Sequence, residues 1–156
     1  MNAEHVDGIE QIISMLRDTR KMTKRERDEL NNRFLMNAIL GMPSKGTAEL
    51  VPPSQPESYL FAKGGGGVKA VDNDFSALIK IVRSGVEVYA KTGTYPAPYY
   101  AWRIAVLLRK QKRTDLEARF LRAYSAKFSD GLGSKYKQLA ERAKKAALLA
   151  RKVTSY

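Results

Sequence analysis

The chain has 156 residues, 44% of them hydrophobic, which suffices for a folded core, and it has no cysteine. The missing cysteines exclude disulfide scaffolds, thiolate metal sites and thiol catalysis. The net charge of +12 is uneven: residues 1–100 hold 13 lysines and arginines against 12 acids, whereas residues 101–156 hold 15 against 4. This asymmetry indicates a polyanionic partner, most often nucleic acid. The alternative is a solubilising surface without a partner.

The N-terminal sequence MNAEHVDGIEQ is polar and acidic, and it lacks the apolar stretch of a signal peptide. No run of apolar residues approaches the roughly 18 that a membrane span requires. We therefore expect a soluble, cytoplasmic protein that does not bind membranes.

Residues 1–41 are expected to form two helices that pack as an antiparallel hairpin, because the link between them is short. The first helix covers about residues 8–21, where apolar side chains recur with the spacing of one helical face: Ile9, Ile12, Ile13 and Leu16. Thr23 and Glu26 have the spacing of a capping box that starts the second helix. Gly41 and the proline after it end this helix.

Residues 42–73 are rich in proline and glycine and are expected to separate the two halves of the chain as a loop or linker. A small β-hairpin is an option here, with strands at Ser58–Ala62 and Val68–Val71.

Four glycines at 64–67 lie between Lys63 and Lys69. They lack the Gly-Lys-Ser/Thr sequence of a phosphate loop, and no helix follows at once as in a dinucleotide fold. We favour a flexible tip or hinge. The alternative is a mobile loop in which Lys63 and Lys69 contact phosphate.

Residues 74–156 are expected to form a basic helical domain. Asp74 is placed to cap a helix that ends near Tyr89 or Lys91, and Pro98 suits the first turn of the next helix. Tyr99, Tyr100 and Trp102 near its start invite a base-stacking interpretation, but aromatic residues at helical spacing are more often part of a core.

Two further helices complete this half. Thr114 and Glu117 have the spacing of a second capping box. The helix that follows places aromatic and aliphatic residues at intervals of four, at Leu116, Phe120, Tyr124 and Phe128. Ser134 is expected to cap the last helix.

Residues 99–129 resemble a tetratricopeptide-like helical hairpin. Trp102 and Ala118 are sixteen residues apart, as are the first tryptophan and the small residue of the second helix in that family. The resemblance implies an all-helical packing of hairpins and a tendency to bind peptides. It assigns no site residues.

The last helix, from Ser134 to about Val153, carries the most informative pattern. Its apolar residues form one arc, and its basic residues form two rows beside each other. The predicted nucleic-acid-binding residues are Lys137, Lys144, Lys145, Arg151 and Lys152, supported by Arg109, Lys112 and Arg113. The alternative is a solvated helix whose lysines only add solubility.

Catalysis is not expected. His5 is the only histidine, so neither a histidine-rich metal site nor a thiolate site is available. Asp72 and Asp74 suit a magnesium ion beside phosphate, but Asp74 is better explained as a helix cap. We expect no metal and no cofactor.

Together these patterns predict an all-α protein, or nearly so, with five or six helices in antiparallel hairpins. The predicted function is non-enzymatic binding of the nucleic-acid backbone, DNA or RNA, with little sequence specificity. The alternative is a tetratricopeptide-like adaptor that binds an acidic protein segment, as an accessory subunit of a nucleoprotein complex.

Overall fold

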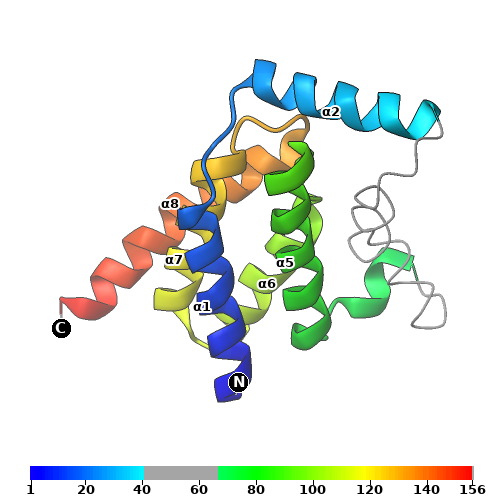
Figure 1. Cartoon of the computed structure of the whole chain (residues 1–156). Helices are drawn as coiled ribbons and strands as arrows, with labels where there is room; N and C mark the ends of the chain where they lie inside the picture. The colour runs from blue at the N-terminus through cyan, green and yellow to red at the C-terminus, as the bar shows by residue number, and fades with distance from the viewer. Residues whose placement is uncertain (41–66, 156) are drawn as a thin grey trace.

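The computed structural model describes residues 1–40 and 67–155, and these contain helices but no strand. The all-α prediction is confirmed (Figure 1). The elements are α1 (Ala3–Asp18), α2 (Lys24–Ile39), a 3-10 helix η2 (Gly67–Val71), α5 (Phe75–Thr92), α6 (Pro98–Lys110), α7 (Thr114–Phe128) and α8 (Ser134–Thr154).

Helices α5, α6, α7 and α8 pack in chain order, each against the next, and α1 lies against α5 and α7. Their apolar faces meet in one hydrophobic cluster. The stripe predicted for α1 is buried in it, at Ile9, Ile12, Ile13 and Leu16. The helix begins five residues earlier than predicted, because the Asn2 side chain accepts a hydrogen bond from the His5 amide and caps it.

Helix α2 crosses the end of the bundle (Figure 1) and contacts α5 rather than folding back on α1. The antiparallel hairpin predicted for residues 1–41 is therefore wrong. The capping box of Thr23 and Glu26 is confirmed. Polar contacts hold α2 in place: Asn31 accepts a hydrogen bond from the Thr94 hydroxyl, and the Arg27 guanidinium stacks 4.3 Å from the centre of the Tyr95 ring.

The optional strand at Val68–Val71 does not form, because Gly67–Val71 is a 3-10 helix. Amide-to-carbonyl bonds from Asp72 to Lys69 and from Asp74 to Val71 continue this turn directly into α5. The other optional strand of this hairpin, Ser58–Ala62, lies outside the described residues.

Asp74 caps α5 as predicted, through a bond from the Ala77 amide, and Pro98 occupies the first turn of α6. Gly85 lies within α5 at the point where the segment containing Pro96 passes close to this helix. A Cβ atom at residue 85 would lie 2.7 Å from the Cβ of Pro96, so only glycine permits this approach.

Two predicted caps are wrong. Thr114 and Ser134 are the first helical residues of α7 and α8, and the capping positions are Arg113 and Gly133, neither of which makes a side-chain cap bond. The carboxylate of Glu117 is not free to cap α7, because it is bound elsewhere, as described below.

Candidate nucleic-acid interface

Helix α8 packs chiefly on α7, through the buried side chains of Tyr136, Leu139 and Ala146. Its 21 residues exceed the 15 of α7 by six, which corresponds to about 9 Å of helix. The predicted apolar arc continues to Val153, but this residue is 69% exposed. Figure 1 shows the C-terminal end of α8 projecting from the bundle.

The side of α8 that faces away from α7 carries five exposed basic residues, which we call the cationic face: Lys137, Lys144, Lys145, Arg151 and Lys152. At about 100° per residue they fall within an arc of about 120°. None of them makes an ion pair with another residue that the structure describes. Between the first and the last of them, Glu141 and Leu148 share this arc.

The row from Lys137 through Lys144 to Arg151 extends about 20 Å along the helix. Duplex DNA carries one phosphate charge for about every 1.7 Å of its axis, counting both strands. The row is therefore long enough to lie along several phosphates of a nucleic-acid backbone.

The three supporting cations at the end of α6 are less available. Arg109 is bound to Glu117 at 2.9 Å, and Arg113 lies 3.6 Å from Asp115. Lys112 is exposed and makes no ion pair with a described residue, in a turn where its φ is +57°. Of this set, Lys112 alone resembles the cationic face in exposure and lack of a partner.

Sequence reasoning missed a buried charge cluster between three helices. Glu117 of α7 is completely buried, and its two carboxylate oxygens accept hydrogen bonds from Arg109 of α6 at 2.9 Å and Arg142 of α8 at 2.8 Å. Arg142 also donates to the Ala105 carbonyl. The partners are 8 and 25 residues from Glu117, so the local pattern that indicated a cap gave no sign of them.

Two other arginines of the last third are bound within the protein. Arg119 pairs with Glu10 of α1, and Arg103 donates two hydrogen bonds to the Asp72 carbonyl. The chain thus divides its cations: several arginines bind acids and carbonyls in the bundle, whereas the cationic face, mainly lysine, points outward.

The aromatic residues of α6 serve packing. Tyr100 is buried, and the Tyr99 hydroxyl donates to Asp72 at 2.6 Å. Burial and this bond raise the pKa of the Tyr99 hydroxyl. Lys135 lies over the Trp102 ring, 4.5 Å from its centre. The same Asp72 thus has a structural role in place of the magnesium site considered from the sequence.

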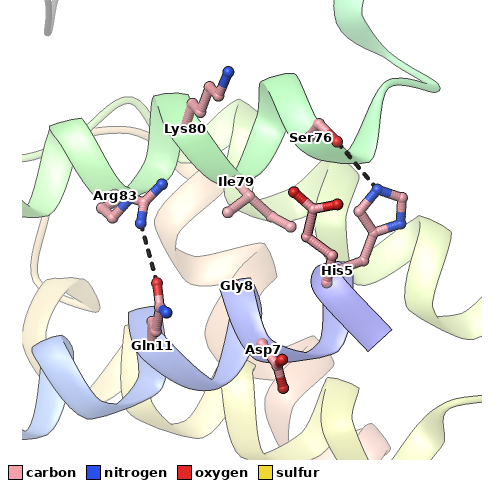
Figure 2. Close-up of a pocket in the computed structure, with 9 residues that line it drawn as sticks. His5, Asp7, Gly8, Gln11, Ser76, Ile79, Lys80 and Arg83 are labelled. Atoms are coloured by element: carbon pink, nitrogen blue, oxygen red, sulfur yellow. Dashed lines mark hydrogen bonds between the residues drawn. The ribbon is translucent and has the colours of Figure 1, made fainter. Parts of the chain in front are cut away.

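A groove of about 440 Å³ lies between α1 and α5, and its lining includes no residue of α8. His5 and Ser76 share a 3.1 Å hydrogen bond at one end, and Arg83 donates to Gln11 at the other (Figure 2). Figure 2 shows Asp7 and Lys80 pointing away from the space between the helices. The residues around the groove include two acids on α1, Glu4 and Asp7, and two bases on α5, Lys80 and Arg83, so its lining has no single sign of charge.

Of the two predicted loop contacts, Lys69 is exposed in η2, and Lys63 lies outside the described residues. Within residues 1–40 and 67–155, no three histidine, cysteine or acidic side chains are grouped so as to hold a metal ion. In the same ranges, every helix is too short or too polar to cross a bilayer.

Comparison with known proteins gives no relative. The chain matches no protein-family model, no curated protein and no solved structure. The tetratricopeptide resemblance of residues 99–129 therefore remains a prediction, although α6 and α7 are adjacent packed helices.

Proposed function

We propose that this protein binds the phosphate backbone of nucleic acid through the cationic face of α8, with little sequence specificity. The observation that carries the proposal is that five basic side chains point outward from one helix, each without an acidic partner in the described structure. Binding would release counterions from the nucleic acid, which supplies most of the free energy of non-specific association.

Low specificity follows from the chemistry of the face. Four of its five cations are lysines, which act as point charges on phosphate, whereas base reading relies on bidentate groups placed in a groove. Backbone contacts position a protein without reading sequence. We therefore expect similar affinities for unrelated sequences of the same length.

A salt titration tests this proposal. The logarithm of the affinity for a short duplex should fall with the logarithm of the salt concentration, with a slope of about 0.9 per phosphate contacted, or about 0.7 for a single strand. Replacing Lys137, Lys144 and Arg151 together by alanine should reduce the duplex slope by up to about three contacts' worth.

A matched control removes the same charges from other surfaces. Arg17, Lys80 and Lys91 are exposed and make no ion pair with described residues, so their triple alanine variant has the same net charge as the first. It should keep nearly the whole slope. Equal losses in both variants would mean that net charge alone attracts the nucleic acid, and no binding at low salt would refute the proposal.

A second candidate is an adaptor for an acidic protein segment. It is favoured by the aliphatic side chains on the end of α8, of which Leu148 is 59% exposed. A segment that alternates acidic and apolar residues would contact Leu148 and the neighbouring lysines together. In that case an acidic peptide would bind with affinity that falls on Leu148→Gln, while nucleic acid would not bind.

A further inference from the structure

The buried cluster of Glu117, Arg109 and Arg142 joins the three helices next to the cationic face. We infer that Glu117 is a positioning residue, which fixes the rotation of α8 about its own axis and thereby the outward direction of the cationic face. This inference rests on the proposed function, since it concerns how the same surface is presented.

The apolar contact between α8 and α7 leaves this rotation weakly defined along much of the helix. Beyond Leu139 its buried face consists of alanine, with Ala146 buried and Ala143 partly buried. Alanine permits close approach, but its single methyl group fills no deep hole in the neighbouring helix, so a modest rotation costs little packing.

At the start of α8 the Tyr136 hydroxyl donates to the Pro96 carbonyl, and Arg142 supplies a second polar restraint farther along the helix. It is on the same side of α8 as Leu139 and Ala146, and it binds Glu117 of α7 and the carbonyl of Ala105 of α6. A rotation of α8 would break both contacts. Such a break would leave the buried carboxylate of Glu117 with Arg109 alone. Breaking a buried ion pair is strongly unfavourable, so the cluster holds α8 at one angle.

Replacing Glu117 by glutamine tests the inference, because the shape is kept while the charge is lost. The glutamine amide group would face an arginine donor, and two guanidinium groups would lie close together without a counter-charge. We expect α8 to lose its fixed rotation. The salt slope for duplex binding should fall by about one unit, and affinity at low salt should fall several-fold.

Glu141→Gln is the matched control, since Glu141 is exposed within the arc of the cationic face. Both variants remove one negative charge, which by itself strengthens the attraction of an anion. Glu141→Gln should therefore bind more tightly than the unaltered protein, whereas Glu117→Gln should bind more weakly. The opposite signs distinguish a change in positioning from a change in charge.

The measurements are made well below the midpoint of thermal unfolding of each variant, with helix content checked by circular dichroism. If Glu117→Gln is folded and binds as tightly as Glu141→Gln, the inference is wrong, whatever the loss of stability. If it does not fold, Arg142→Met is measured instead, and an unchanged slope there has the same meaning. If the unaltered protein shows no salt-dependent binding, the proposed function itself fails.

Discussion

Asp130, in the turn between α7 and α8, ties this turn to two other parts of the chain. Its carboxylate accepts a hydrogen bond from the Tyr95 hydroxyl at 2.7 Å, and Lys21 and Arg27 lie 3.7 and 4.0 Å away. The Tyr95 bond and, to a smaller degree, the two cations lower the pKa of the Asp130 carboxyl. The ionised form is therefore favoured in the folded protein.

Because folding lowers this pKa, Asp130 stabilises the protein above the pKa it has in the unfolded chain, near 4. That contribution disappears as the pH falls through the folded value. We expect Asp130→Asn to lose about 0.5–1 kcal/mol of unfolding free energy at neutral pH, a small value because Asp130 is half-exposed. The difference from the unaltered protein should vanish in acid.

Denaturant titrations of both proteins across this pH range measure the difference. Carboxylates elsewhere in the chain titrate alike in the two proteins, so their contributions cancel. A difference that stays constant from neutral pH to acid would show that the substitution disturbs packing rather than charge.

At the scale of a single element, α5 depends on the absence of a side chain at Gly85. Alanine within a helix is normally more stable than glycine by about 1 kcal/mol. Here the new methyl group would overlap Pro96, which is buried and whose carbonyl accepts a hydrogen bond from Tyr136. We expect Gly85→Ala to destabilise the protein by about 1–3 kcal/mol, as in other overpacked cores.

Thermal or chemical unfolding of Gly85→Ala gives the sign directly. Ser84→Ala, one residue earlier in the same helix, should change the stability by less than about 0.5 kcal/mol. A more stable Gly85→Ala protein would mean that the loop containing Pro96 moves aside at little cost.

The helices themselves were predictable because their apolar stripes and several end signals are local. Ile9 to Leu16 mark one face of α1, and Thr23 and Asp74 each cap a helix. The packing of α2 was not predictable, because the short link after α1 also allows an antiparallel hairpin. Its direction is decided by contacts of Asn31 and Arg27 with Thr94 and Tyr95, which are distant in the sequence. Glu117 is a similar case, because its arginine partners are also distant in the sequence and no local pattern indicates them.

The candidate site was predictable for a similar reason. Seven-residue spacing within one helix places Lys137, Lys144 and Arg151 in a row whatever α8 packs against. Whether the two supporting arginines are free to bind phosphate could not be predicted. Arg109 is paired with Glu117, and Arg113 with Asp115. Pairing is a property of the folded chain that residue spacing does not encode.

Across the whole molecule, the tip of α8 contributes charge but little stability. Beyond Leu148 no described side chain is buried, and all but the partly buried Ala150 are exposed. We expect a chain that ends at Leu148 to lose less than about 1 kcal/mol of unfolding free energy, because few buried contacts are removed.

The same shortened chain lacks Arg151 and Lys152, so its salt slope for duplex binding should fall by up to about two contacts' worth. Denaturant unfolding and the salt titration measure the two effects on one protein. A large loss of stability would mean that the tip packs against the body in solution.

Because the C-terminal end of α8 projects from the bundle, binding of nucleic acid should change how much of this end is helical. Terminal helical turns without tertiary contacts unwind and reform readily in water. Arg151 and Lys152 therefore belong to a segment that exchanges between a helical and an unwound form. A polyanion bound along the helical form would raise the population of that form. Amide hydrogen exchange in the last two turns should therefore become slower when nucleic acid is bound. Part of the binding free energy would be used to form helix in these turns.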